Sequence, residues 1–203
     1  KYNGTDPVSA LGTGIDKVLN IGEVIDFESD SADYGLTDFG GVTSSIVADP
    51  TDSSNKVVSI AKNAGSDDWA GTSVASGSIF YPLTSTETGI TVRVWSPAAG
   101  VQVKMKLEES GDTSKHVETD AVTSVSSGWE TLTFDFRNHS EGTPALNSSY
   151  VFDNLILYFN YGVVGADEVY YFDDIKFIGA IPLDVTAASL VGNWKMAPEA
   201  GAF

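Results

Sequence analysis

The sequence lacks cysteine altogether and has few basic residues. The absence of cysteine excludes a disulfide framework, a thiolate metal site and a cysteine nucleophile. No apolar run approaches the roughly 20 residues that a membrane-spanning helix requires. Only 11 lysines and arginines stand against 28 acidic residues, which gives a net charge of −17. Nucleic acid and anionic membrane surfaces are therefore disfavoured as partners, because both attract basic proteins.

The chain is long enough for one domain with tails. Its 203 residues are 42% hydrophobic, which suffices for a core of normal size. The pattern predicts a polar linker or arm over residues 1–22, a packed domain over 23–180, and a linker with the start of a further module over 181–203. The chain opens at Lys1 without a signal peptide, so we expect a processed or excised piece of a longer protein.

Short stretches of alternating apolar and polar residues recur along the central part of the chain, separated by turn residues. About ten strands and no helix are predicted, which is typical of an antiparallel β-sandwich or jelly roll. The predicted strands occupy residues 24–28, 42–48, 56–61, 69–74, 79–83, 91–96, 101–108, 116–123, 129–136, 154–160 and 169–178.

The stretch from Thr91 to Glu108 is the one around which we organise the prediction. It reads as two strands joined by a turn over residues 97–100. Alternation gives this hairpin one aliphatic face and one polar face, because side chains of a strand point to alternate sides. The polar face carries Arg93, Trp95, Lys104, Lys106 and Glu108. An indole among hydrogen-bonding groups suits the weakly apolar face of a sugar ring, although an ordinary charged surface with one tryptophan fits the same pattern.

Several motifs together resemble a known family. The predicted domain opens with Asp26-Phe27-Glu28 and closes with Tyr170-Tyr-Phe-Asp-Asp-Ile-Lys-Phe177. Between them lie Trp69-Ala-Gly71, Val94-Trp-Ser-Pro97, Lys104-Met-Lys-Leu-Glu108 and Trp129-Glu-Thr-Leu-Thr-Phe134. Over residues 24–178 the chain resembles the β-sandwich carbohydrate-binding modules of multimodular glycan-binding and glycan-degrading proteins of marine Bacteroidetes, in the style of families 4, 9, 16 and 22. The resemblance implies a non-catalytic module that binds glycans.

The candidate carbohydrate-binding residues are an aromatic platform and a polar rim on a concave sheet face. Trp129 precedes an alternating core strand and is interpreted as structural. The alternative for the platform is that its tryptophans close the sandwich, and the alternative for the rim is ordinary cross-strand ion pairing. The candidates are Trp69, Arg93, Trp95, Lys104, Glu108, His116, Tyr158 and Asn160.

The resemblance also implies a structural calcium ion. In the resembling families, carboxylates at the start of the first and last strands bind the ion, and these positions match Glu28 and Asp173 here, with Asp26 as a further donor. Calcium takes six to eight oxygen ligands, so backbone carbonyls would have to complete the shell. The alternative is that these are unrelated surface carboxylates.

The expected function is binding of a polysaccharide without catalysis, with no catalytic residue assigned. By resemblance the first choice of ligand is laminarin, a β-1,3-glucan, and alginate is the alternative. A small jelly-roll lyase or glycosidase would need a cluster such as Arg93, His116 and Tyr158. A spacer without ligand is the third alternative. We expect a secreted or outer-membrane surface-anchored protein whose partners are a polysaccharide and neighbouring modules of the same polypeptide.

Overall fold

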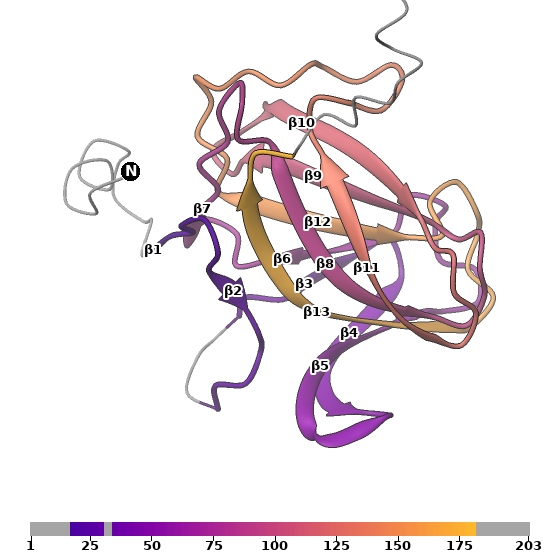
Figure 1. The fold of residues 1–203 in the computed structure, drawn as a ribbon. Coiled ribbons are helices and arrows are strands. Elements are labelled where there is room, and N and C mark those ends of the chain that lie inside the picture. Colours follow the sequence, from indigo (N-terminus) through magenta and orange to yellow (C-terminus); the bar gives the residue numbers. More distant parts are fainter. Residues whose placement is uncertain (1–16, 31–33, 182–203) are drawn as a thin grey trace, which may run out of the picture.

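The fold was analysed in a computed structural model, which describes residues 17–30 and 34–181 (Figure 1). These residues form thirteen strands and no helix. The strands are β1 Lys17–Val18, β2 Val24–Ile25, β3 Thr37–Phe39, β4 Val42–Asp49, β5 Asp52–Lys62, β6 Gly71–Val74, β7 Ile79–Phe80, β8 Gly89–Ser96, β9 Gln102–Glu109, β10 Asp112–Val122, β11 Gly128–Asp135, β12 Asn154–Phe159 and β13 Glu168–Gly179. The described part of the chain accordingly contains no helix able to cross a membrane.

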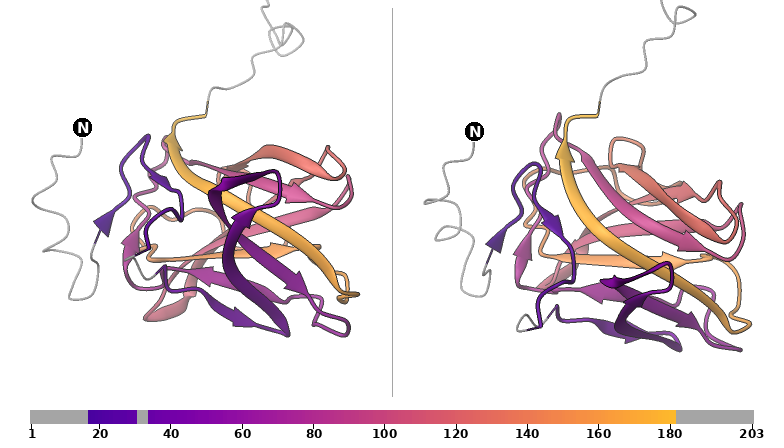
Figure 2. Two further views of the ribbon diagram at one scale, coloured as in Figure 1. Left: turned by 90° about the horizontal axis from the view of Figure 1, so that it is seen from below. Right: turned by 60° about the horizontal axis from the view of Figure 1, so that its bottom comes forward.

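Two antiparallel sheets face each other in two layers (Figure 2). One sheet has five strands in the order β10-β9-β12-β6-β3. The other has six, with β11-β8-β13-β5-β4 in a row and β2 paired to the edge of β13. A short parallel pair of β1 and β7 closes one end. The predicted all-β sandwich of the jelly-roll type is therefore confirmed, with more strands than the ten expected.

The core lies between the sheets and follows the alternation of the sequence. Val92 and Val94 of β8 are fully buried, as are Leu155 and Leu157 of β12 on the facing sheet. Phe172 of β13 joins the same cluster. Burying each such side chain contributes about 1.5–3 kcal/mol, so the inward faces hold the two sheets together.

The predicted hairpin over Thr91 to Glu108 is wrong, although both of its strands are present. β8 pairs with β11 and β13, whereas β9 pairs with β10 and β12 of the other sheet. Residues 97–101 therefore cross from one layer to the other instead of turning within a sheet. Alternation in a strand tells which residues share a face but not which strand is its neighbour.

The packed part of the chain begins before the predicted boundary at residue 23. β1 starts at Lys17 and pairs with β7, and Leu19 is fully buried in the core. Gly22 donates its N–H to the carbonyl of Phe177 in β13 at 2.7 Å. The described residues of the predicted N-terminal arm are thus part of the sandwich. The linker and module start predicted over 181–203 lie outside the described residues from residue 182 on.

Candidate functional site

Four aromatic side chains gather on the outer face of the five-stranded sheet. Trp69 stacks on Phe39 with ring centroids 6.0 Å apart and planes inclined by 16°. Tyr158 meets Phe39 edge to face at 5.7 Å, and Tyr161 meets Tyr158 at 5.6 Å. Trp69 leaves 51% of its surface exposed. We call Phe39, Trp69, Tyr158 and Tyr161 the aromatic cluster; it presents one open indole backed by three further rings.

Gly71 is what allows the aromatic cluster to form. Gly71 of β6 lies directly opposite Phe39 of the neighbouring strand β3. A Cβ atom on Gly71 would come within 2.8 Å of the Tyr158 ring and within 3.0 Å of the Phe39 ring. Real Cβ contacts under 3.0 Å are essentially never seen, so a side chain at this position would displace the Tyr158 ring and crowd the Phe39 ring that supports Trp69.

A charged row continues from the aromatic cluster across the same face. Lys104 lies opposite Tyr158 on β12 and Asp120 on β10. Its ammonium is 3.0 Å from a carboxylate oxygen of Glu118, 3.5 Å from Asp120, and 4.6 Å from the centre of the Tyr161 ring. The lysine therefore links the rings to the carboxylates and is held by both.

The row ends in a second, more deeply buried group. Lys106 contacts Glu108 at 2.7 Å, and the Asn154 amide donates to the other oxygen of Glu108 at 2.9 Å. Glu108 is nearly buried, and the Asn154 side-chain oxygen has no hydrogen-bond partner among the described residues. Fixed donors and acceptors side by side are the arrangement that pairs with the vicinal hydroxyl groups of a sugar.

His116 joins this face at its edge, whereas Asn160 does not. The His116 ring contacts Glu118 at 3.8 Å through Nε2, and its Nδ1 lies 3.1 Å from the carbonyl of Thr113. Asn160 follows β12 with a left-handed backbone of φ 50°, and its side chain lies beside the core residue Tyr170. Its predicted place beside Tyr158 is wrong, because the turn after β12 breaks the alternation on which that prediction rested.

Trp95 and Arg93 lie on the opposite side of the molecule. Both alternate with the buried Val92 and Val94 of β8, so they point outward from the six-stranded sheet. Trp69, Tyr158, Lys104 and Glu108 belong to the five-stranded sheet instead. The predicted single platform across Trp69 and Trp95 is therefore not formed, for the same reason that the predicted hairpin fails.

Arg93 is the centre of a polar cluster on that second face. Its two terminal nitrogens contact Asp49 at 3.1 Å and Asp173 at 3.3 Å, both of which are buried. The guanidinium carbon lies 3.9 Å above the Trp129 ring, whose Nε1 donates to Asp49 at 3.2 Å. Trp129 thus has a structural contact, as the sequence predicted, and it also fixes the arginine.

The two carboxylates beside Arg93 have opposite pKa shifts. Burial alone would raise the pKa of Asp49, but hydrogen bonds from Thr51, Trp129 and Arg93 outweigh burial and lower the pKa to about 2. Burial raises the pKa of Asp173, and hydrogen bonds from the Asn55 amide and the Asp174 backbone offset this only in part. Asp49 is the better-stabilised anion of the two.

Asp49 should therefore contribute to stability at neutral pH and lose that contribution in acid. Because its pKa is lower in the folded protein than in the unfolded chain, about 2 kcal/mol is present above pH 5 and disappears toward pH 1. Asp173 acts in the opposite direction, since a raised pKa favours folding as pH falls. We expect Asp49→Asn to destabilise the protein at pH 7 and much less at pH 2.5, measured by urea unfolding. An equal destabilisation at both pH values contradicts this assignment.

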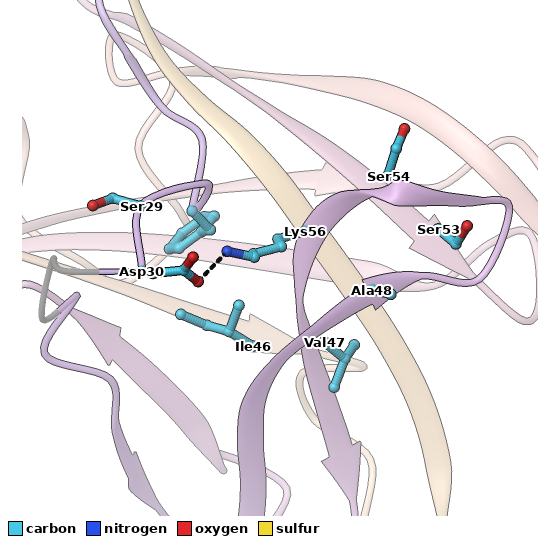
Figure 3. Close-up of a pocket in the computed structure, with 9 residues that line it drawn as sticks. Ser29, Asp30, Ile46, Val47, Ala48, Ser53, Ser54 and Lys56 are labelled. Carbon is cyan, nitrogen blue, oxygen red and sulfur yellow. Dashed lines mark hydrogen bonds and ion pairs between the residues drawn. The ribbon is translucent and has the colours of Figure 1, made fainter.

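A hollow of about 440 Å³ lies between the β4–β5 hairpin and residues 27–30 (Figure 3). Lys56 spans it: the ammonium contacts the Asp30 carboxylate and, at 3.1 Å, the carbonyl of Glu28. The Glu28 carboxylate accepts from the Lys56 backbone at 2.7 Å. The exposed Ile46 lines the other side. The Lys56 ammonium, a cation of the protein itself, therefore lies beside the oxygens of Glu28 and Asp30.

The three carboxylates predicted for calcium do not form one donor set. Glu28 is bound by Lys56, Asp173 by Asn55 and Arg93, and Asp26 accepts from the Glu28 backbone at 3.3 Å. Among the described residues no three acidic or histidine side chains meet as metal ligands. A structural calcium ion stays a prediction. An ion held only by the folded protein would raise the melting temperature, so unchanged melting in excess chelator, with no metal by elemental analysis, contradicts it.

The cluster that a lyase would need is not brought together. Arg93 lies on the outer face of the six-stranded sheet, while His116 and Tyr158 lie on that of the five-stranded sheet. Burial, together with the nearby Glu118 and Glu108 carboxylates, raises the pKa of Tyr158 well above its usual range. A tyrosine so shifted is a poor base at neutral pH.

Comparisons of sequence find no relative: no protein-family model matches the chain, and neither does any curated protein. Solved structures do match in fold. The family 11 carbohydrate-binding module from Clostridium thermocellum, in complex with a β-1,3-1,4-mixed-linked tetrasaccharide, is 18% identical with a TM-score of 0.52, over 80% of this chain and 98% of that one. The tandem of two family 22 modules from Paenibacillus barcinonensis is 17% identical with a TM-score of 0.50, over 85% and 49%.

An enzyme structure is similar as well. An exo-β-agarase matches with 11% identity and a TM-score of 0.55, over 80% of this chain but only 26% of that protein. At such identities the likeness shows the fold alone. The chain therefore has the β-sandwich fold that carbohydrate-binding modules of families 11 and 22 adopt.

Proposed function

We propose that this protein is a non-catalytic carbohydrate-binding module whose binding surface is the outer face of the five-stranded sheet. The observation that carries the proposal is the half-exposed Trp69, supported by Phe39 at one end of a row of fixed charged groups. Stacking places the apolar face of a sugar on the indole, and hydrogen bonds from Lys104 and Glu108 orient its hydroxyl groups. The fold shared with known modules supports the same function.

The charges of this face favour a neutral glycan over a polyanion. Lys104 and Lys106 stand against Glu108, Glu118 and Asp120, so two cations meet three carboxylates in direct ion pairs. A uronate chain would have to compete with these carboxylates for the two lysines. The net charge of −17 adds long-range repulsion. A neutral β-glucan, with laminarin as first choice, is therefore the proposed ligand, and alginate becomes the less favoured alternative.

Affinity electrophoresis against laminarin, mixed-linkage β-glucan, xylan, alginate and carrageenan tests this function. Retarded migration in a neutral glucan gel is the expected result. Retardation in none of the gels favours a spacer domain. Release of reducing or unsaturated sugar ends from any of them favours an enzyme.

Binding to laminarin should change less than about threefold between low and high salt. A neutral sugar releases no counterions, whereas binding of a polyanion weakens steeply as salt rises. Isothermal titration at two salt concentrations measures the difference. Tight, salt-sensitive binding of alginate with none of laminarin contradicts the proposed ligand.

The module is proposed to work outside the cell, because polysaccharides such as laminarin are found there. A secreted or surface-anchored parent protein, in which neighbouring modules supply any catalysis, agrees with the non-catalytic role. Detection of the parent protein in culture medium or on intact cells tests this location.

A further inference from the structure

A second aromatic row crosses the outer face of the six-stranded sheet. Trp129, Trp95 and Tyr171 stand opposite one another on three adjacent strands, β11, β8 and β13. Trp95 meets Tyr171 edge to face at 5.4 Å, and Trp129 lies 6.5 Å from Tyr171. All three rings are only partly buried. A plain solvated sheet face does not need three large rings in one row, because they expose apolar surface to water.

Arg93 beside this row is held in a fixed position and has N–H donors beyond those used in its two ion pairs. The contacts to Asp49 and Asp173 use one terminal nitrogen each, and the Trp129 ring supports the flat side of the guanidinium. A guanidinium has five N–H donors. The side chain keeps 28% of its surface exposed, so the remaining donors can reach a ligand. Little conformational entropy is left to lose when such a group binds.

A hollow of about 380 Å³ adjoins Arg93 on the same face. Its lining includes Thr91, Arg93 and Thr131 of β8 and β11, and Asp174 and Lys176 of β13. The volume is in the range of small-molecule sites, about 300–1,000 Å³. A bulge in β13 makes the shape, since the register shifts between Asp173 and Lys176 and Asp174 has a φ of 50°. Bulges re-aim side chains at such places.

We infer that the outer face of the six-stranded sheet is a second glycan-binding surface. Trp95 is the stacking ring, and Arg93, Asp174 and Lys176 are the hydrogen-bonding groups around the hollow. Two cations, Arg93 and Lys176, are outnumbered by Asp49, Asp173 and Asp174, so an uncharged, hydroxyl-rich chain fits better than a polyanion. The surface uses no residue of the first site and faces away from it. One module could then hold two glycan chains at once.

Isothermal titration with hexasaccharides of β-1,3-glucan, mixed-linkage β-glucan and xylan tests the inference. The unaltered protein is expected to bind two hexasaccharides per chain. Trp69→Ala should keep only the site on the six-stranded sheet, and Trp95→Ala only the site on the five-stranded sheet. In each variant the affinity of the altered site should fall more than tenfold. The variant with both changes should bind none.

A second variant guards against a folding defect in Trp95→Ala. Thr131 is exposed and lines the hollow, so Thr131→Tyr fills the hollow without removing a ring. Ser114→Tyr places the same side chain at an exposed position of β10, on the other sheet. We expect Thr131→Tyr to weaken the second site at least fivefold and Ser114→Tyr to leave it unchanged, with equal melting temperatures.

The outcomes separate this inference from the proposed function. One site that Trp69→Ala abolishes and that Trp95→Ala and Thr131→Tyr leave intact overturns the inference and keeps the proposed function. A single site that Trp95→Ala and Thr131→Tyr weaken and that Trp69→Ala leaves intact supports a glycan surface on the six-stranded sheet. It overturns the proposed placement of the site on the five-stranded sheet. No binding of any hexasaccharide or polysaccharide overturns both.

Discussion

Replacing Trp69 by alanine should weaken glycan binding at the five-stranded sheet by at least tenfold. The loss corresponds to about 1.4 kcal/mol or more, as expected when an aromatic anchor is truncated. Half of the ring is open to a ligand and the other side rests on Phe39, so the change removes the stacking surface itself. Isothermal titration with the hexasaccharide that binds best gives the affinity.

Stability should hardly change in the same variant. Trp69 is half exposed and lies in the link before β6, outside the buried core, so we expect the free energy of unfolding to fall by less than about 1 kcal/mol. Trp69→Phe keeps a smaller ring and should bind with intermediate affinity. Normal binding by Trp69→Ala at every site would falsify the proposed platform, and unfolding of the variant would show that the indole is a core residue.

Replacing Lys62 by methionine should cause the largest loss of stability among the variants discussed. Lys62 is the last residue of β5 in the six-stranded sheet. Its side chain is fully buried and reaches the end of β12 in the facing sheet. Its ammonium donates to the carbonyls of Phe159 at 3.0 Å and Asn160 at 2.9 Å. Methionine fills the same space but removes two charge-assisted hydrogen bonds, which costs about 2–4 kcal/mol. The Asn160 carbonyl keeps the N–H of Val163 at 3.2 Å, so the buried Phe159 carbonyl is the group that the loss of the ammonium affects most. Urea unfolding measures the change.

The same lysine should also affect the binding face. The carbonyls that it holds precede Tyr161, and the adjoining Gly162 donates to the carbonyl of Asp68, next to Trp69. Lys62→Met should therefore loosen both ends of the aromatic cluster and weaken glycan binding even where the variant is folded. Lys56→Met on the same strand is the control, because Lys56 is partly exposed and ion pairs at the surface contribute little to stability. Equal unfolding free energies for the two variants would contradict this role of Lys62.

Alternation in the sequence was enough to predict the strands and the core but not their arrangement. Each long predicted strand is present, because a strand buried on one side must alternate. The hairpin centred on residues 97–100 was mispredicted because a turn that begins at Pro97 and ends at Gly100 can either reverse the chain within a sheet or carry it to the opposite sheet. Only the pairing of β9 with β10 and β12 decides between these, and it depends on residues far away in the sequence.

The candidate site was likewise predicted in part: the residues that share a face were found, and two rings from irregular segments were missed. Trp69, Lys104, Glu108 and Tyr158 do share a face, since β9 and β12 pair directly and Trp69 stacks over β3. Two further rings were missed. Phe39 stands in a segment rich in Asp, Ser and Gly between the predicted strands 24–28 and 42–48, and Tyr161 follows β12 where alternation ends. An aromatic residue inside a polar, glycine-rich stretch was the one signal that could have indicated Phe39.

Nuclear magnetic resonance titration of the protein with a neutral β-glucan hexasaccharide tests the central claim most directly. The proposed function predicts shifts of the Trp69 indole N–H and of backbone amides along β9 and β12, from Lys104 to Tyr158. The Trp129 indole N–H, held by Asp49 and Thr51 on the six-stranded sheet, reports separately on the inferred second surface. Shifts that leave Trp69, β9 and β12 untouched, or no shifts with any neutral glycan of the panel, would contradict the account.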